Sequence, residues 1–254
     1  MKIVVCIKQT FDSEEQIVIN DGKVIDNGVE YIINPYDEYA LEEAISLRDK
    51  YGGEVTVITI GPARSESAIR TALAMGVDHG VIVDNSTIPQ DQYTVSKVLA
   101  ELIKERGFDL IFAGNSSIDS GSGQVPIRLA EELDIPHISN AIQLSIEGEQ
   151  ITVHRDVEGD IEVIQSSIPI LITAQQGLNE PRYPSLPGIM KAKKKGIECL
   201  NASDLLLSEP LVSKTIIVDE YTPQKKAAGR LLEGEISSQV QQLVTLLRNE
   251  ARVF

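Results

Sequence analysis

One loop in the sequence combines the residue types that hold a phosphate group. It spans residues 114–125, follows a short apolar run that ends at Ala113, and leads into a helical pattern. Its glycines let the backbone approach a ligand closely, and serine hydroxyls together with the free amides of a helix start suit an anion. A polar connecting loop with a capped helix start fits the same composition, so both interpretations remain open.

The sequence lacks the patterns of other phosphate-binding loops and of catalytic sites. No G-x-x-x-x-G-K-[ST] pattern occurs, and the first apolar run is followed by residues 8–12, which contain no glycine. This argues against a dinucleotide fingerprint at that strand. The side chains also offer no Ser-His-Asp order, no paired carboxylates with an obvious site and no metal-ligand spacing. We therefore expect a binding protein rather than an enzyme, with no catalytic or metal-ligating residue.

A second polar segment, Asn34-Pro35-Tyr36-Asp37, precedes the first long helical pattern. Asn34 or Asp37 can cap backbone amides, and Pro35 restricts the backbone where the helix begins. A plain helix start explains this spacing. The alternative is a segment that packs against an adenine or a ribose near the sheet edge.

One basic cluster stands out in an acidic chain whose formal net charge is −15. It consists of Lys191, Lys193, Lys194 and Lys195. Such a run is either a solvated helix face or an attachment surface for an acidic partner. The proline-rich segment just before it contains Leu186, which is either an exposed hydrophobic anchor or a core leucine.

The elements that must position these residues alternate along the first 135 residues. Apolar runs predict strands at residues 3–7, 55–60, 81–83 and 110–113, and helical spacing predicts helices at residues 36–51, 65–75, 93–106 and 125–133. Such alternation predicts a parallel sheet with helices on both faces. Ligands in such sheets lie beyond the carboxyl ends of the strands, where the 114–125 loop is expected.

The pattern then changes to an antiparallel addition and an arm. Extended segments at residues 141–146, 150–155 and 161–166 are separated by turn signals, and a further strand (169–174) and a short helix (188–195) follow. Residues 201–230 show weak signals. A helix over residues 234–252 ends the chain, with an apolar stripe that must cover this domain or a partner. The fold class is therefore α/β, a doubly wound and mostly parallel sheet with an antiparallel addition and a C-terminal arm.

Composition narrows the partners and the compartment. The net charge of −15 would repel nucleic acid and anionic membranes, and no stretch of about 18 apolar residues occurs. The N-terminal apolar run is interrupted by the charged Lys8 and is therefore too short for a secretory signal. Cys6 and Cys199 have no redox or metal spacing. We expect a cytoplasmic protein that binds no nucleic acid and does not insert into membranes.

Four segments carry a family resemblance, in the order in which the family has them. They are residues 34–40 (N-P-Y-D-E-Y-A), 70–76 (R-T-A-L-A-M-G), 155–160 (R-D-V-E-G-D) and 179–195, which includes the prolines and the basic cluster. With these segments the chain resembles the beta subunit of electron-transfer flavoproteins. The resemblance covers nearly the whole chain and weakens only around residues 85–92 and 203–225.

The resemblance implies a fold and a division of labour. The fold is Rossmann-like, of the adenine nucleotide alpha-hydrolase-like type. The beta subunit binds one structural AMP and pairs with an alpha subunit that holds most of the FAD. The heterodimer takes electrons from acyl-CoA-type dehydrogenases, as in fatty acid beta-oxidation, and passes them to the respiratory chain. Residues 1–200 would form the nucleotide-binding domain with a docking loop at 181–195, and residues 201–254 an arm and helix that contact the alpha subunit.

The family's functional residues map onto this sequence by position. Those implied to contact the nucleotide are Cys6, Asn34, Pro35, Tyr36, Asp37, Ile60, Gly114, Asn115, Ser116, Ser117, Ile118, Asp119, Ser120, Gly121, Ser122, Gly123, Gln124 and Val125. Those implied to dock partner dehydrogenases are Arg182, Tyr183, Pro184, Ser185, Leu186, Pro187, Ile189, Met190 and Lys191, with Leu186 as the anchor. The family often has another residue where Ile60 stands, so a backbone contact is expected there. Some members carry a tyrosine near residue 13 that faces the flavin; here the residue is Ser13.

Two alternatives accompany this interpretation. A flavin-bifurcating branch of the family binds a second FAD in place of AMP, but its docking loop looks different from the ordinary type found here. A stand-alone nucleotide-binding regulatory protein on the same fold would not explain residues 181–195 or the amphipathic end of the chain.

Overall fold

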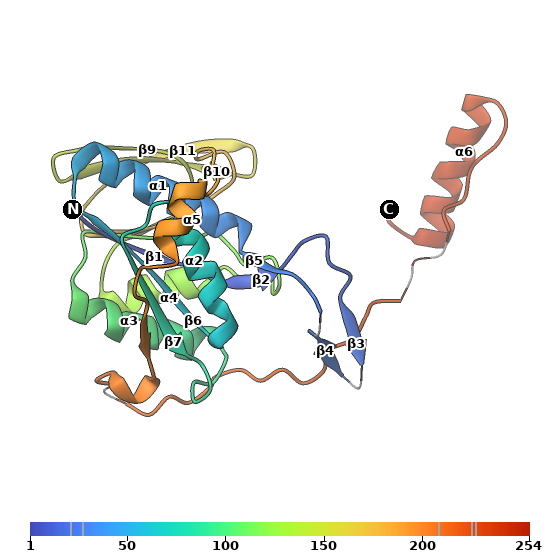
Figure 1. Ribbon diagram of the computed structural model, residues 1–254. Coiled ribbons are helices and arrows are strands. Elements are labelled where there is room, and N and C mark those ends of the chain that lie inside the picture. The colour runs from blue at the N-terminus through green and yellow to red at the C-terminus, as the bar shows by residue number, and fades with distance from the viewer. Residues whose placement is uncertain (21, 27, 208, 225, 227) are drawn as a thin grey trace. The chain divides into compact units, whose positions relative to one another are not determined.

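A nine-stranded sheet lies at the centre of the larger of two compact units in the computed structural model (Figure 1). The structure describes residues 1–20, 22–26, 28–207, 209–224, 226 and 228–254. The strand order in the sheet is β11-β10-β9-β12-β8-β1-β6-β7-β13. The bounds are β1 (Lys2–Cys6), β6 (Glu54–Gly61), β7 (His79–Asp84), β8 (Leu110–Gly114), β9 (His137–Glu147), β10 (Gln150–Val157), β11 (Asp160–Ser167), β12 (Ile170–Ala174) and β13 (Glu198–Leu200).

Pairing divides this sheet into a parallel part and an antiparallel addition. The strands from β9 through β12, β8, β1, β6 and β7 to β13 pair in parallel, whereas β10 pairs antiparallel with β9 and with β11. Both parts were predicted from the sequence and are confirmed. β9 begins before residue 141, the predicted start, and its register against β12 shifts near Asn140, which has a φ of 60°. This irregularity interrupts the alternation of side chains, which hid the first residues of the strand.

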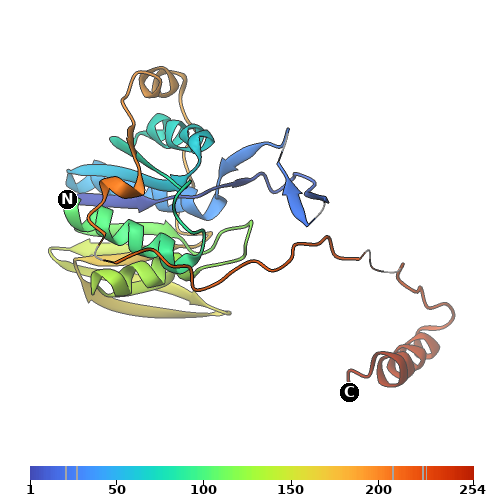
Figure 2. The same ribbon diagram turned by 90° about the horizontal axis from the view of Figure 1, so that it is seen from below.

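Helices cover both faces of the sheet, as Figure 2 shows from below. They are α1 (Pro35–Tyr51), α2 (Glu66–Met75), α3 (Gln92–Arg106) and α4 (Gln124–Leu133). On β1, Ile3 and Val5 belong to the core cluster that contains the buried residues of α1 and α2, whereas Val4 and Cys6 belong to the cluster of α3 and α4. Successive side chains of a strand point to opposite faces, so a strand covered on both sides needs an unbroken apolar run.

The order of the strands reverses between β1 and β8. From β1 the sheet grows outward through β6 and β7, and the chain then returns to place β8 on the other side of β1. In doubly wound sheets, ligands bind outside the carboxyl ends of the strands at such a reversal. The segments that follow β1 and β8 therefore border the expected ligand position.

A short helix, α5 (Leu186–Ala192), packs against α2. It begins two residues before the predicted helix, because Ser185 Oγ accepts the amide of Gly188 (3.1 Å) and a proline is tolerated in the first turn. Leu186 therefore lies in a helix rather than in the predicted loop. Gly188 lets the two helices approach closely, since a Cβ atom there would lie 2.3 Å from the carbonyl oxygen of Ala74.

Several three-residue strands were not predicted. They are β2 (Gln9–Phe11) and β5 (Tyr31–Ile33), which pair with each other, β3 (Val18–Asn20) and β4 (Lys23–Ile25), which also pair, and β13 at the edge of the main sheet. A strand of three residues contains too few alternations for hydrophobic periodicity to reveal it.

The two compact units divide the chain unequally. The larger comprises residues 1–17 and 25–218, and the smaller comprises residues 18–24 and 219–254. The smaller unit contains α6 (Ile236–Leu246), which a π-helical turn (Leu247–Ala251) continues, in agreement with the helix predicted at 234–252. No residue of α6 is buried. The functional division predicted after residue 200 stays a prediction.

The described part of the chain contains no helix that is both long and apolar enough to cross a membrane. Nor does that part contain a group of three or more His, Cys, Asp or Glu side chains that could hold a metal ion. Cys6 and Cys199 are both free thiols.

Candidate functional site

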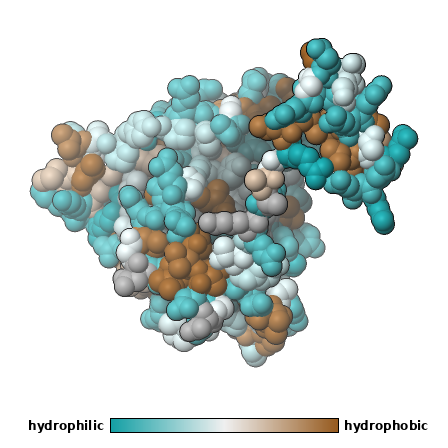
Figure 3. Space-filling model, turned by 90° about the vertical axis from the view of Figure 1, so that its right-hand side faces the viewer, coloured by the Kyte–Doolittle hydropathy of each residue, from teal (hydrophilic) through white to brown (hydrophobic). Residues whose placement is uncertain are grey.

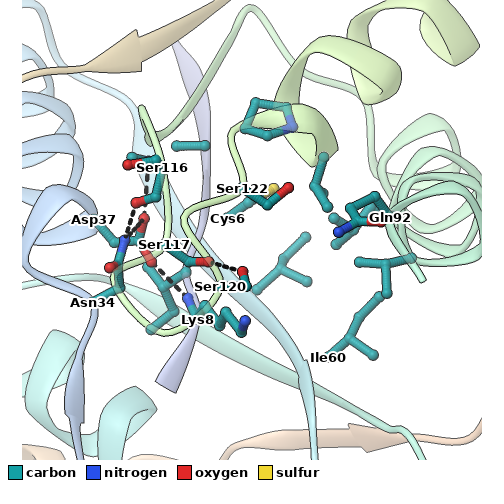
Figure 4. A pocket seen from close by; sticks show the side chains of 18 of the residues that line it. Cys6, Lys8, Asn34, Asp37, Ile60, Gln92, Ser116, Ser117, Ser120 and Ser122 are labelled. Atoms are coloured by element: carbon teal, nitrogen blue, oxygen red, sulfur yellow. Dashed lines mark hydrogen bonds between the residues drawn. The ribbon is translucent and has the colours of Figure 1, made fainter. Parts of the chain in front are cut away.

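A pocket of about 260 Å³ lies at the reversal point of the sheet, where β1 and β8 end and α1, α3 and α4 begin (Figure 4). In Figure 4 the serines of the loop after β8 and Asn34 lie on one side, and Ile60 and Gln92 lie on the other. The lining residues are Cys6, Ile7, Lys8, Asn34, Asp37, Ile58, Ile60, Gln90, Asp91, Gln92, Val95, Leu99, Ala113, Gly114, Ser116, Ser117, Ser120, Ser122, Val125 and Pro126.

Asn34 ties the loop after β8 to the start of α1. Its Nδ2 donates to the carbonyl oxygen of Ser116 (2.9 Å), and its Oδ1 accepts the backbone amide of Ile118 (3.1 Å). Asn34 is buried, and its side chain makes no capping bond to α1. Its polar groups therefore fix the loop, and Nδ2 also donates to the Asp37 carboxylate on α1 (3.1 Å).

Asp37 is a buried carboxylate that joins three segments. Its Oδ2 accepts the backbone amide of Lys8 (2.7 Å), and its Oδ1 accepts the amide of Gly114 (2.9 Å) and Nδ2 of Asn34 (3.1 Å). Burial raises the pKa of Asp37 to about 7, although these donors act to lower it. The carboxylate thus holds the ends of β1 and β8 against the start of α1.

Two glycines of the loop occupy positions where a side chain would collide. A Cβ atom on Gly114 would lie 2.3 Å from Oδ1 of Asp37 and 2.7 Å from Cβ of Tyr36, and one on Gly123 would lie 2.5 Å from the carbonyl oxygen of Asn115. Glycine is required at both because the backbone itself packs closely there.

The rest of the loop is held by hydroxyl groups and by a lysine. The amide of Ser117 donates to the carbonyl oxygen of Ser122 (3.1 Å), and the hydroxyl oxygens of Ser117 and Ser120 lie 2.7 Å apart. Lys8 Nζ lies 2.7 Å from a carboxylate oxygen of Asp119. Partial burial acts to raise the pKa of Asp119, but Lys8 together with the hydroxyls of Ser117 and Ser120 outweighs burial, so the pKa falls below its usual value. Hydroxyl groups, a cation and the first amides of α4 can together accommodate an anionic group.

The opposite wall of the pocket is largely apolar. Ile58 and Ile60 come from β6, and Val95 and Leu99 come from α3. Cys6 completes this wall with a buried thiol, and burial, assisted by the charge of Asp37, raises the pKa of Cys6 to about 12. The neutral thiol and aliphatic side chains suit a flat, uncharged ring system better than a phosphate.

Many of the candidate residues predicted from the sequence line this pocket in the structure. The predicted residues that line it are Cys6, Asn34, Asp37, Ile60, Gly114, Ser116, Ser117, Ser120, Ser122 and Val125. The predicted residues outside the lining are Pro35, Tyr36, Asn115, Ile118, Asp119, Gly121, Gly123 and Gln124. The structure therefore brings together both predicted segments, and the ligand itself stays a prediction.

The lining also contains residues that the sequence did not single out. They are Ile7, Lys8, Ile58, Gln90, Asp91, Gln92, Val95, Leu99, Ala113 and Pro126. The start of α3 could have been found from topology, because it follows β7 at the same edge of the sheet as the loop after β8.

A second candidate surface surrounds α5. Leu186 is 79% exposed, and Tyr183 and Met190 are also exposed. Arg182 anchors this segment, because its Nε lies 2.8 Å from a carboxylate oxygen of Glu42 on α1. Lys195 is only partly exposed, unlike the other lysines of the basic cluster, and donates to the carbonyl oxygen of Val77 (2.7 Å). On the face of the molecule that Figure 3 shows, hydrophobic residues form patches among hydrophilic ones.

The fold and the pocket place the chain in the class of doubly wound α/β proteins with a ligand-sized pocket at the reversal of the strand order. The chain matches the family described as "Electron transfer flavoprotein domain" over residues 21–205. It is 53% identical over 257 residues to the electron transfer flavoprotein subunit beta of Bacillus subtilis (strain 168), covering 100% of each chain. The electron transfer flavoprotein subunit beta of Syntrophomonas wolfei subsp. wolfei (strain DSM 2245B / Goettingen) is 41% identical over 254 residues, which cover 100% of this chain and 98% of the relative. The human protein of the same name is 35% identical over 239 residues, which cover 92% of this chain and 93% of the relative.

The chain therefore belongs to the electron transfer flavoprotein family, among its beta subunits. This confirms the resemblance seen in the sequence.

Proposed function

We propose that this chain binds AMP in the pocket between β1 and β8, pairs with an alpha subunit that holds FAD, and docks dehydrogenases through α5. The observation that carries the proposal is the pocket itself, with a serine-lined loop and a lysine on one side and an apolar wall on the other. The phosphate group of AMP would meet the loop and the adenine ring the apolar wall. The chain contributes binding and geometry and has no catalytic residue of its own.

The size of the pocket supports AMP over FAD. Its volume of about 260 Å³ lies just below the usual range for small-molecule sites, roughly 300 to 1,000 Å³. A mononucleotide suits such a volume better than a dinucleotide that carries a flavin. FAD in this position, as in the flavin-bifurcating alternative, would need the loop after β8 or the start of α3 to move.

Family membership supports the partner subunit and the electron-carrying role. Relatives named as a beta subunit imply an alpha subunit, and the exposed α6 offers an apolar stripe for it. FAD supplies the electron-carrying chemistry when bound, while the protein supplies its position and surroundings. Electrons would come from acyl-CoA-type dehydrogenases in a cytoplasmic setting and continue to the respiratory chain.

The surface around α5 supports the docking role. It presents Leu186 on a short helix whose base is pinned by the ion pair between Arg182 and Glu42. An exposed apolar anchor on a rigid base loses little conformational entropy when it is buried by a partner. The exposed Lys191, Lys193 and Lys194 would favour an acidic partner surface and speed the encounter.

Mass spectrometry of the ligands released from the denatured heterodimer tests the proposal. We expect AMP and FAD from the unaltered protein. Ser122→Asp places a carboxylate beside the expected phosphate and should lower the recovered AMP about tenfold or more through charge repulsion. Ser167→Asp, on the outer strand β11, is the matched control and should leave AMP unchanged.

Three results would contradict this assignment. A second FAD in place of AMP would support the flavin-bifurcating alternative. Equal AMP from both variants would place the nucleotide outside this pocket. A chain that purifies without a flavin-bearing partner and without a nucleotide would not act as proposed.

A further inference from the structure

Asp91 uses both oxygens of its carboxylate to join two segments that are far apart in the sequence. Its Oδ1 accepts the amide of Thr94 (2.9 Å) and the hydroxyl of Thr94 (2.7 Å), which caps α3. Its Oδ2 accepts the backbone amides of Lys214 (2.5 Å) and Thr215 (3.1 Å). Asp91 is buried, so each of these bonds is largely shielded from water.

The segment that Asp91 holds runs along α3 before it leaves the larger unit. Leu205 is buried in the core cluster of α3 and α4, and Leu207 and Leu211 pack against that cluster. Glu209 lies 3.6 Å from Lys97 Nζ on α3, and Lys214 Nζ lies 5.2 Å from the ring centre of Tyr93. The strap, residues 205–207 and 209–215, therefore contacts α3 at several points, and Asp91 holds its end through Lys214 and Thr215.

Directly after Thr215 the side chains are no longer packed against α3 but exposed to solvent. Ile216, Ile217 and Val218 are almost fully exposed, and the smaller unit continues from residue 219. An apolar run that follows a firm attachment has its starting point set by that attachment. Asp91 therefore fixes where the C-terminal part of the chain departs.

The same residue also forms part of the pocket wall. Gln90, Asp91 and Gln92 all line the pocket, and they are the residues that lead into α3. A ligand that packs against this turn restrains it, and the turn is what holds the strap. The two events share one element, although Lys214 and Thr215 do not line the pocket.

We propose that Asp91 is a positioning residue that couples the pocket to the departure of the C-terminal arm, so that pocket occupancy and the ordering of residues 213–218 favour each other. The proposal rests on the proposed function, because it takes AMP as the ligand of the pocket. By linkage, the factor by which AMP stabilises the strap equals the factor by which an intact strap raises the affinity for AMP. A change in the strap, outside the pocket, must then weaken AMP binding.

The bonds from the amides of Lys214 and Thr215 to Asp91 form a clamp, and two substitutions separate this clamp from the helix cap. Asp91→Asn replaces one acceptor oxygen by a donor group and so cannot serve all four donors at once. Lys214→Pro removes one of the donated amides and leaves the cap on Thr94 intact. The matched control is Asp109→Asn, since Asp109 also accepts a backbone amide, that of Lys2 (2.7 Å), but outside the pocket lining.

Hydrogen–deuterium exchange and calorimetric titration of the full chain with AMP give the two readouts. Without AMP, exchange at Thr215 should be about tenfold faster in Asp91→Asn and Lys214→Pro than in the unaltered chain. Asp91→Asn removes the charge of the acceptor of the Thr215 amide, and Lys214→Pro removes the neighbouring bond that holds the same segment. AMP should slow exchange over residues 213–218 in the unaltered chain and in Asp109→Asn, and much less in the two clamp variants. Lys214→Pro should also weaken AMP binding several-fold, with exchange at Thr94 unchanged.

The possible outcomes distinguish a failure of the proposed coupling from a failure of the assignment of AMP to the pocket. Equal AMP affinity in Lys214→Pro and the unaltered chain, with strap exchange indifferent to AMP, would overturn the coupling while leaving AMP binding in place. Failure of the unaltered chain to bind AMP would overturn the proposed function instead. In that case the exchange at Thr215 without ligand still decides whether Asp91 holds the strap, since equal rates in Asp91→Asn and Asp109→Asn would refute it.

Discussion

At the scale of single residues, the pocket depends on carboxylates that accept hydrogen bonds from backbone amides. Asp37 accepts hydrogen bonds from the amides of Lys8 and Gly114, and Asp91 accepts them from the amides of Thr94, Lys214 and Thr215. The two differ in their protonation. Burial raises the pKa of Asp37 to about 7. Burial also acts to raise the pKa of Asp91, but its four donors outweigh burial and hold it well below the usual range.

Asp37 should make the folding stability depend on pH. Its pKa is 3.8 in an unfolded chain and about 7 in the native state, so between these values the native state binds more protons. The free energy of unfolding therefore falls as pH rises through this window, by about 2 to 3 kcal/mol between pH 5 and pH 8. Asp37→Asn removes this contribution and flattens the profile.

Urea denaturation of both proteins at several pH values measures this effect. The difference between the two profiles isolates Asp37 from other titrating groups. A difference that stays constant from pH 5 to pH 8, or grows in favour of the aspartate as pH rises, would contradict a raised pKa.

Leu186→Ala should change docking and leave stability intact. Leu186 is 79% exposed, so its truncation should cost less than about 0.5 kcal/mol of folding stability. Loss of an apolar anchor at the centre of an interface costs about 2 kcal/mol or more, which would slow reduction by a partner dehydrogenase roughly thirtyfold at limiting concentrations. Leu206→Ala is the matched control, because Leu206 is 80% exposed and lies outside the docking segment.

Stopped-flow reduction of the heterodimer at several dehydrogenase concentrations checks this prediction. Dissociation of the heterodimer on Leu186→Ala would instead assign Leu186 to the subunit interface. Equal rates in the two leucine variants would remove Leu186 from the docking surface.

Residue identity in the pocket was only partly predictable. The loop after β8 was found because glycine and serine at a strand-to-helix junction have a direct physical meaning. Gln90, Asp91 and Gln92 carry no such signal, because polar residues before a helix are common. Only the pairing of distant segments, such as Asp91 with Lys214, gives them a role.

At the scale of elements, the position of α5 depends on a close helix crossing. Gly188 lies against the carbonyl oxygen of Ala74 on α2, and Arg70 of α2 donates to the carbonyl oxygens of Ala192 and Lys195. These contacts fix the helix that presents Leu186. The docking surface is thus set by packing between helices rather than by its own few residues.

Gly188→Ala should displace α5. The new Cβ atom would lie 2.3 Å from a backbone oxygen, so the helix must move, at a cost of about 1 to 3 kcal/mol. Gly196→Ala is the control, since no atom lies within 4 Å of a Cβ atom placed there. Urea denaturation should show a loss of stability for the first variant alone, with a slower dehydrogenase reaction. A fully stable Gly188→Ala protein with an unchanged reaction would mean that α5 tolerates the shift.

Elements were predicted well where they are long and poorly where they are short. Strands buried on both faces, such as β1 and β6, show as apolar runs, and the long helices show a full period. The three-residue strands β2 and β13 gain their stability from neighbours in space, which a single sequence does not display. The start of α5 was missed because its proline-rich first turn has the composition of a loop.

At the scale of the whole molecule, the chain has exposed apolar side chains that are not buried in the core of the larger unit. On α6 the exposed apolar side chains are Ile236, Val240, Leu243 and Val244. They recur at helical spacing and form one stripe, which is the pattern of a helix that packs on a partner. A net charge of −15 keeps such a chain in solution in spite of this stripe.

Leu243→Asp should weaken subunit association without unfolding the chain. Leu243 is exposed, so the aspartate costs little folding stability in the isolated chain. In the heterodimer the same position would be buried, and loss of a leucine contact alone is worth about 1.5 to 3 kcal/mol, roughly a 10- to 150-fold rise in Kd. Gln241→Asp adds the same charge about 200° away around the helix and is the control. Sedimentation or titration of the two subunits should show weaker association for Leu243→Asp alone. Equal weakening by both variants would make net charge the cause, and no weakening by either would mean that the stripe of α6 covers something other than the alpha subunit.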